Sequence, residues 1–513
     1  MPESYHGDRP RGATVRAVGF GWRHAGRLRP TISDLDLDIE PGQRVLLLGE
    51  SGSGKSTLLA AIAGVLGGDD EGDRTGSLLV EGRPPEQARG VVGMVLQDPD
   101  SQVISSRVGD DVAFGCENLG VERSEIWRRV GRALEMVGLD LPLDHPTAEL
   151  SGGQKQRLAL AGVIAMGARL ILLDEPTANL DPDGVAEVRD AVDRVVRETG
   201  ATLIVVEHRV EIWSPIIDYA LVLGGADRGL VAAGPLDEVI ASEGLRLAEE
   251  GVWIPGIPLD LPPVRSHAPG TDADPALEAR ELTVGWEEGR PVGSPRNLRL
   301  PEGRSTVITG PNGAGKSTLA LTLAGLMSPL GGEVLASDRV AEELSGGPHS
   351  WSSRELATRI GFVFQDPEHQ FVARTVRSEL LIGPVVTAGR RGRFGLWRRL
   401  TGHPPADAVT AADRARVDEL LERLRLEHLA EANPFSLSGG QKRRLSVATA
   451  LVTTPSVLIL DEPTFGQDRR TFTELILLLR DLVDDGVTLA SITHDPLFAH
   501  VLGDHRIEVD GHA

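Results

Sequence analysis

The sequence predicts an α/β fold, built as two similar domains in tandem on one chain. Its 513 residues exceed the about 250 to 300 that one hydrophobic core usually serves. Several short segments of the first half recur in the same order in the second half. In each half, apolar runs typical of buried strands alternate with longer patterns typical of amphipathic helices.

Composition and charge limit the class of protein and of partner. The chain is 41% hydrophobic and 25% charged, as in globular proteins, and no apolar run is long enough to cross a bilayer. Residues 1–16 lack the apolar stretch of a secretory signal. The single cysteine, Cys116, predicts a cytoplasmic protein, and we expect its side chain simply to be buried or half-buried. A net charge of -22 repels phosphate backbones, so we expect no nucleic-acid partner.

The repeat consists of five segments, each present in both halves. They are GESGSGKST at 49–57 and GPNGAGKST at 310–318, LQDPDSQ at 96–102 and FQDPEHQ at 364–370, LSGGQ at 150–154 and 437–441, LILLDE at 170–175 and VLILDE at 457–462, and VVEHR at 205–209 and SITHD at 491–495. Five matches in one order leave little room for chance.

A proline-rich stretch separates the two halves. Prolines interrupt regular helices and sheets, so we interpret residues 246–276 as a linker between a first domain at 1–245 and a second at 277–513. In each half an apolar strand, at 44–49 or 305–310, runs into a glycine-rich turn and a helix. Alternation at 33–40 predicts a further strand, and helical patterns at 124–139 and 415–429 predict a helical subdomain inserted into each α/β core.

The glycine-rich segments fit the phosphate-binding loop pattern G-x-x-x-x-G-K-[ST] between a strand and a helix. Glycines allow backbone N–H groups to surround phosphates, the lysine adds a positive charge, and the next hydroxyl suits Mg²⁺. The residues are Gly49, Gly52, Gly54, Lys55, Ser56 and Thr57 in the first half, and Gly310, Gly313, Gly315, Lys316, Ser317 and Thr318 in the second.

Two carboxylates end a buried strand in each half. Asp174 and Asp461 are expected to hold Mg²⁺ through water, and Glu175 and Glu462 to orient or deprotonate the attacking water. Isolated acidic pairs are common on protein surfaces, but these two follow apolar runs and lie downstream of a phosphate loop. We therefore predict two hydrolytic sites for a nucleotide.

Taken together, the five segments resemble the nucleotide-binding domains of ABC ATPases. The resemblance covers nearly all of both halves and implies two P-loop NTPase domains, each with a RecA-like core, an antiparallel β subdomain and a helical subdomain. It implies ATP and Mg²⁺ as cofactors. LSGGQ is the signature of this family, although a serine followed by two glycines is also a common start of a helix.

In this family two domains face each other head to tail, so the signature of one completes the ATP site of the other. The resemblance thus implies an intramolecular pseudo-dimer. One site would combine Lys55, Asp174, Glu175 and His208 with Ser438, Gly440 and Gln441, and the other would combine Lys316, Asp461, Glu462 and His494 with Ser151, Gly153 and Gln154. Asp181 and Asp468 match the family's aspartate after the two acids.

The resemblance gives roles to three further kinds of residue. His208 and His494 match the switch histidine that contacts the γ-phosphate, Gln97 and Gln365 match the glutamine that contacts Mg²⁺ and its water, and Trp22 and Trp286 match the aromatic that stacks on adenine. A core position is the alternative for both tryptophans. The second half has TFGQD where the first half has TANLD, and the first half has VEHR where THD is the commoner form in the family. These differences predict unequal ATP sites.

Each QDP segment ends in a second glutamine, Gln102 or Gln370. This extended QDP-x-x-Q form resembles that of the ATPases of energy-coupling factor (ECF) transporters, which import vitamins and transition-metal ions. That resemblance implies an integral membrane coupling (T-type) partner, a substrate-binding (S-type) partner, and a peripheral location at the cytoplasmic face of the membrane. The alternatives are a tandem ATPase of a sugar importer and a soluble ribosome-associated ABC ATPase. An insertion, GRRGRFGLWRRL at 389–400, is either a membrane contact or a solvated loop.

Overall fold

The computed structural model describes residues 12–510 except 51, 67–70, 179, 226–227, 262, 264–273, 288, 388–408 and 465, so the 389–400 insertion lies outside the described residues. The chain forms two compact units, the first ending at Pro258 and the second containing most of the residues from 259 onwards. This corrects the predicted linker start at 246. Helix α7 continues to Glu249, and Val252 and Ile254 are buried in the core of the first unit. The predicted linker end also shifts slightly, because β10 begins at Pro275.

The first unit contains a three-stranded antiparallel sheet and a six-stranded core sheet. The small sheet has the order β2 (Ile32–Ile39), β1 (Val15–His24), β4 (Gly72–Val80). The core sheet has the order β5 (Val92–Val95), β6 (Leu170–Asp174), β7 (Thr202–Val206), β3 (Arg44–Gly49), β8 (Tyr219–Leu223), β9 (Leu230–Pro235), all parallel except the last pair.

Alternating apolar residues give the core sheet two buried faces. In β3, Val45 and Leu47 contribute to one hydrophobic cluster, which includes the small sheet, whereas Leu46 and Leu48 contribute to another, which includes the helical subdomain. Because side chains alternate along a strand, a continuous apolar run is buried on both faces. The predicted strands at 33–40, 44–49 and 170–175 are thereby confirmed as β2, β3 and β6.

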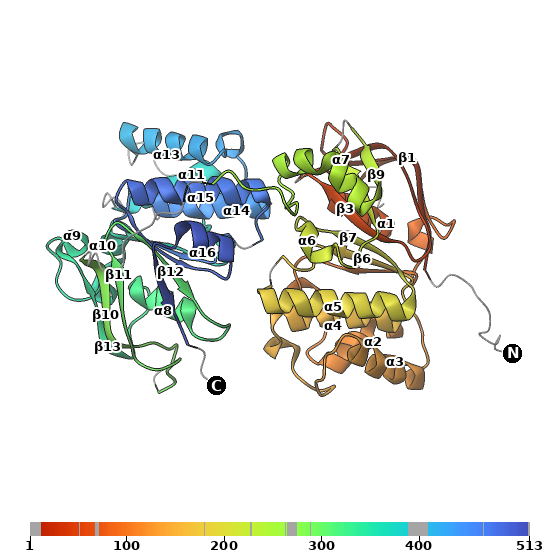
Figure 1. Ribbon diagram of the computed structural model, residues 1–513, viewed down its shortest axis with the longest axis horizontal. Helices are drawn as coiled ribbons and strands as arrows, with labels where there is room; N and C mark the ends of the chain where they lie inside the picture. The colour runs from red at the N-terminus through yellow and green to blue at the C-terminus, as the bar shows by residue number, and fades with distance from the viewer. Residues whose placement is uncertain are drawn as a thin grey trace. The chain divides into compact units, whose positions relative to one another are not determined.

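Helices cover both faces of this sheet. They are α1 (Lys55–Ile62), α2 (Val108–Asn118), α3 (Arg123–Met136), α4 (Gly152–Met166), α5 (Pro182–Thr199), α6 (Val210–Trp213) and α7 (Leu236–Glu249). Figure 1 shows α2 to α5 gathered on one side of the sheet. Helices α2 and α3 form the predicted helical subdomain and pack against α4, which begins directly after the signature serine.

The second unit repeats this plan. Its small sheet has the order β11 (Arg296–Pro301), β10 (Pro275–Thr283), β13 (Gly331–Ala336), and its parallel sheet has the order β14 (Ile360–Val363), β15 (Val457–Asp461), β16 (Thr488–Ile492), β12 (Ser305–Thr309), β17 (His505–Glu508). Its helices are α8 (Lys316–Leu323), α9 (Asp338–Ala341), α10 (Ser353–Ala357), α11 (Val376–Thr387), α13 (Ala411–Arg423), α14 (Gly439–Leu451), α15 (Arg469–Asp484) and α16 (Pro496–Leu502). The predicted helix at 415–429 ends early, at Arg423.

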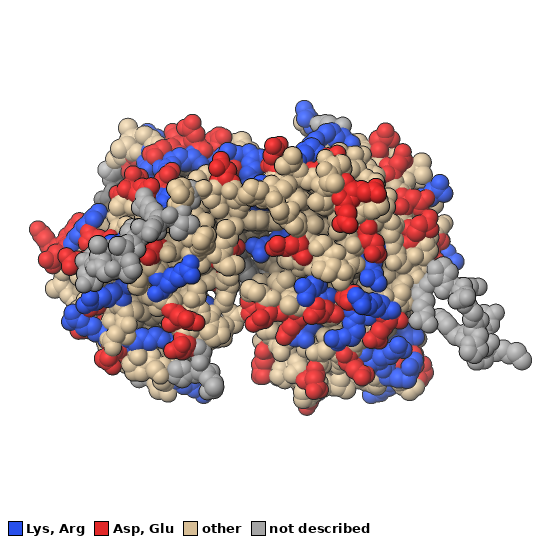
Figure 2. Space-filling model, in the orientation of Figure 1, with Lys and Arg blue, Asp and Glu red and all other residues tan. Residues whose placement is uncertain are grey.

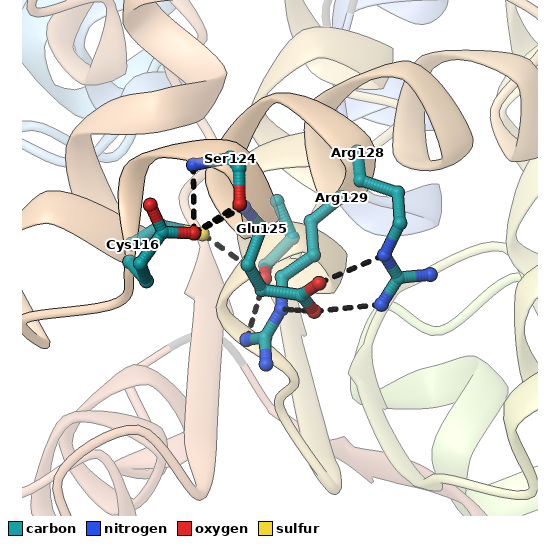
Figure 3. Close-up of polar contacts among 7 residues, drawn as sticks. Cys116, Ser124, Glu125, Arg128 and Arg129 are labelled. Carbon is teal, nitrogen blue, oxygen red and sulfur yellow. Dashed lines mark hydrogen bonds and ion pairs between the residues drawn. The ribbon is translucent and has the colours of Figure 1, made fainter.

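A polar network fixes the far end of the first signature helix, as Figure 3 shows. The backbone oxygen of Ala165, near the end of α4, accepts from Cys116 Sγ at 3.1 Å and Arg129 Nη1 at 3.5 Å. Glu125 accepts from Arg128 and Arg129, and these hydrogen bonds lower its pKa to about 2. Cys116 is buried, as predicted, and burial raises the pKa of its thiol.

Candidate active sites

The phosphate loop of the first half is wound around its lysine. Gly49, Gly52 and Gly54 have φ values of 143°, 85° and 97°, which residues with a side chain rarely adopt. Lys55 Nζ donates to the backbone oxygens of Gly49 at 2.8 Å and Glu50 at 3.0 Å. Burial lowers the pKa of Lys55, although four nearby carboxylates oppose this. The loop therefore holds a buried cation at the start of α1, where phosphate binds readily.

The second half builds the same loop. Gly310, Gly313 and Gly315 have φ values of 148°, 77° and 83°, and Lys316 Nζ donates to the oxygens of Gly310 and Pro311, both at 2.9 Å. The match extends from the sequence to the backbone conformation.

The acidic pairs end the central strands β6 and β15, beside the phosphate loops. Ser56 Oγ donates to Asp174 Oδ1 at 3.1 Å, so the two residues predicted for Mg²⁺ lie together. In the second half, Asp461 Oδ1 is buried and has no hydrogen-bond partner among the described residues. A buried carboxylate oxygen in that state suits a metal ion or its water, so these residues fit Mg²⁺.

Both glutamates have strained backbones, with φ values of 45° for Glu175 and 47° for Glu462. Such strain is typical of functional positions. Their carboxylates differ. Burial opposes ionisation of Glu175, but the hydrogen bond and charge of His208, with Lys55, outweigh it and lower its pKa. Burial raises the pKa of Glu462 to about 7, and that of Asp174 to about 6.

The predicted switch histidines contact these glutamates. His208 Nε2 lies 2.9 Å from Glu175 Oε1, and Gln97 Nε2 donates to Glu175 Oε2 at 2.9 Å. The corresponding distance in the second half, from His494 Nε2 to Glu462 Oε1, is 3.5 Å, and the His494 backbone N–H donates to Glu462 at 3.3 Å. The first glutamate is thus held more closely than the second.

In each half, the signature serine caps the N-terminus of a helix. Ser151 Oγ accepts from the N–H of Gln154 at 3.3 Å while Gln154 Oε1 accepts from the N–H of Ser151 at 2.9 Å. Ser438 and Gln441 form the same capping box at 3.5 and 3.0 Å. Each signature therefore presents a helix N-terminus, at which the macrodipole favours anions. Asp181 caps α5 by accepting from Gly184 at 2.7 Å, and Asp468 directly precedes α15.

The second glutamine of each QDP segment closes its own loop. Gln102 accepts from the N–H of Leu96 at 2.7 Å and donates to Met94 O at 3.2 Å. Gln370 accepts from Phe364 at 3.4 Å and donates to Phe362 O at 3.2 Å. Both glutamines tie the loop to the end of the preceding strand, so the repeated spacing encodes a repeated local structure.

Comparison with known proteins identifies the family. The ABC transporter family matches residues 32–178 and 294–465, the cores of both halves. The chain belongs to this family.

The chain is similar to curated relatives and to solved structures. The putative HMP/thiamine import ATP-binding protein YkoD of Bacillus subtilis is 34% identical over 510 residues, which cover 94% of this chain and 87% of YkoD. CbiO1 of Clostridium perfringens, part of the ABC transporter complex cbiONQ, is 32% identical over 45% of this chain and 92% of its own, with a TM-score of 0.40. A chain of the ribosome-bound archaeal Pelota and ABCE1 structure is 20% identical, covers 95% of this chain and 76% of its own, and has a TM-score of 0.61. The last likeness shows the shared ABC fold.

As a member of this family, the chain is an ATP-binding ABC ATPase. None of the helices in the described part of this ABC ATPase combines the length and hydropathy that a membrane span requires.

The two predicted adenine-stacking residues of this ABC ATPase differ. Trp22 is 2% exposed within the hydrophobic core, and its ring meets that of His24 edge to face, so it offers no free face to a base. The stacking prediction for Trp22 is wrong for this structure, and its core alternative holds. Trp286 is 73% exposed and remains a stacking candidate. No sequence pattern indicated His24, whose Nε2 lies 3.3 Å from Thr57 Oγ1 of the phosphate loop.

The residue two positions after each signature was not predicted to have a role, yet it contacts the QDP loop. Gln156 donates to the backbone oxygens of Leu96 and Gln97, at 3.1 and 3.4 Å. Arg443 takes its place in the second half and donates to Phe364 and Gln365 at 2.8 and 2.6 Å. Burial lowers the pKa of Arg443 to about 10. The available signal was the difference between KQR and KRR in otherwise matching segments.

Proposed function

We propose that this ABC ATPase is the motor of an ECF-type importer, in which ATP drives uptake of a vitamin or a transition-metal ion through separate membrane subunits. The observation that carries the proposal is that one chain repeats all five sequence segments, each copy with the additional glutamine that closes the QDP loop. A relative named for HMP/thiamine import that aligns along 94% of the chain supports a vitamin or vitamin precursor as the cargo.

In the proposed motor, the halves close head to tail and each signature completes the opposite site. Lys55, Glu175 and His208 would act with Ser438 and Gly440, and the reciprocal set would act with Ser151 and Gly153. The serine caps are compatible with this, because each serine Oγ accepts from a backbone N–H. A hydroxyl that accepts in this way can still donate its own hydrogen to a phosphate oxygen.

Mg²⁺ would be held by Ser56, Gln97 and Asp174 in the first half, and by Ser317, Gln365 and Asp461 in the second. Its chemistry is to neutralise charge on the β- and γ-phosphates. Glu175 and Glu462 would accept the proton of the attacking water, and the histidines would donate to the γ-phosphate once their present contact with glutamate is exchanged.

The proposed partners are a T-type coupling subunit and an S-type substrate-binding subunit at the cytoplasmic face of the membrane. The first glutamine supports this coupling role, because Gln97 contacts the catalytic glutamate from the loop that leads into the helical subdomain. Rotation of that subdomain would move the amide.

The ribosomal alternative is less well supported. The likeness to ABCE1 is at 20% identity and concerns the fold alone. The chain has a net charge of -22, and Figure 2 shows basic and acidic side chains interspersed over the described residues of the face in view. RNA-bound surfaces are typically basic.

The proposal is tested by purifying the tagged full chain from detergent-solubilised native membranes and identifying what accompanies it. We expect integral membrane proteins in fixed stoichiometry, together with ATPase activity that requires Mg²⁺. Sedimentation of the chain with ribosomes, in the absence of membrane proteins, would refute the importer proposal. Copurification with sugar-importer subunits would support the other alternative.

A further inference from the structure

The segment that follows the last helix of the first unit is fixed on the core of that unit. After α7, Gly251 adopts a φ of 103° and turns the chain. The N–H of Val252 then donates to Leu247 O at 2.8 Å, and the side chains of Val252 and Ile254 are 1% and 6% exposed. Residues 251–254 thus pack on the core of the first unit, shortly before that unit ends at Pro258.

This segment pairs with the loop that carries His208. The N–H of Trp253 donates to His208 O at 2.8 Å, and the N–H of Val210 donates to Trp253 O at 3.2 Å, as in a short parallel bridge. Between these two bonds, the guanidinium carbon of Arg209 lies 5.4 Å from the centre of the Trp253 ring. That distance is within the range of a cation–π interaction.

Glu207 holds the same histidine from the other side. Its carboxylate accepts from the N–H of His208 at 2.7 Å and contacts the hydroxyl of Thr177, two residues after Glu175. Glu207 is 5% exposed. The N–H and the C=O of His208 are therefore both fixed, and its ring rests 2.9 Å from the catalytic glutamate.

The second half uses different residues at these positions. Asp495 stands where the first half has Arg209, and its carboxylate accepts from the N–H groups of Leu497 and Phe498 at the start of α16. Thr493 stands in the place of Glu207. There the histidine loop is joined to the helix that follows, and His494 lies 3.5 Å from Glu462.

We propose that Trp253 and Arg209 are positioning residues for His208, and that they make the ATP site of the first half sensitive to the position of residues 251–254. A displacement of residues 251–254 would shift His208 relative to Glu175 and the γ-phosphate. The inference rests on the proposed function, in which His208 acts on the γ-phosphate.

The test uses the full chain with Glu462→Gln, so that turnover reports mainly on the first site. We expect Trp253→Ala and Arg209→Ala each to lower kcat about tenfold, because small displacements in an active site have large effects on rate, with KM changed less than about twofold. Trp253→Phe keeps a ring and should restore most of kcat. Trp127→Ala, on the exposed face of α3, is the matched control and should leave kcat unchanged.

Hydrogen exchange provides a second readout. In Trp253→Ala, we expect the backbone amides of residues 208–210 to exchange faster, while those of 493–495 keep their rates. The inference would be overturned if Trp253→Ala changed neither kcat nor the exchange of residues 208–210. It would also be overturned if Trp253→Ala lowered kcat equally in a Glu175→Gln chain and in a Glu462→Gln chain. If His208→Ala leaves turnover intact, the proposed role of His208 in hydrolysis fails. The exchange result for residues 208–210 still decides whether Trp253 positions the loop that carries His208.

Discussion

Gln97 donates a hydrogen bond of 2.9 Å to the carboxylate of Glu175, whose other oxygen lies 2.9 Å from His208. The first-half glutamate is therefore held from two sides. In the second half, His494 lies 3.5 Å from Glu462, which burial shifts to a pKa of about 7. The two sites share residue types but differ in geometry and charge, so we expect them to contribute unequally to turnover.

Removal of the proposed catalytic carboxylates tests whether both sites hydrolyse ATP. Glu175→Gln and Glu462→Gln should each lower kcat, and the double variant should lose about a hundredfold or more, because general-base catalysis typically contributes that much. The measurement is the release of inorganic phosphate by the purified full chain. Full activity in Glu175→Gln, with complete loss in Glu462→Gln, would mean that only the second site turns over.

The two tryptophans should respond in opposite ways to substitution. Trp286→Ala should weaken ATP binding by about tenfold, since stacking on a base contributes roughly 1–3 kcal/mol. Trp22→Ala should instead destabilise the first unit by about 3–5 kcal/mol, because it empties a buried site. Calorimetric titration with ATP and thermal unfolding separate these effects. An unchanged ATP affinity in Trp286→Ala would exclude it as the adenine contact.

Arg443 should stabilise the second QDP loop through its hydrogen bonds to two backbone oxygens. Arg443→Met leaves the oxygens of Phe364 and Gln365 without their donor, and an unsatisfied buried polar group costs about 1–3 kcal/mol. Arg443→Gln copies Gln156 of the first half and should retain most of the stability. The check is the urea midpoint of the second unit. Equal midpoints for the two variants would show that these hydrogen bonds contribute little.

Glu207 predicts a pH dependence of stability. Burial raises its pKa above the ordinary value of 4.5, so the folded state binds this proton more tightly than the unfolded state. The stability from this group is complete below pH about 4.5 and is lost as pH rises towards the folded pKa. Glu207→Gln removes the titration. Its melting temperature relative to the unsubstituted chain should therefore rise between pH 5 and pH 8, and a constant difference would contradict the raised pKa.

The sequence correctly predicted those features of the fold that depend on local sequence pattern. The apolar runs at 44–49 and 170–175 specified strands β3 and β6, and the glycine spacing specified the positive φ values of both phosphate loops. Side chains whose role depends on distant neighbours were not predictable in this way. Trp22 and Trp286 follow similar segments, yet one is packed in the core and the other is exposed. Likewise, no local pattern indicated that Trp253 pairs with the histidine loop.

The central claim, that each site is completed by the signature of the other half, is tested most directly by mapping vanadate-dependent photocleavage. In a Lys316→Ala chain with ATP and Mg²⁺, nucleotide should be trapped mainly at the first phosphate loop. We predict cleavage near Lys55 and near Ser438, identified by the masses of the fragments. Cleavage near Lys55 and Ser151 instead would show that each half completes its own site.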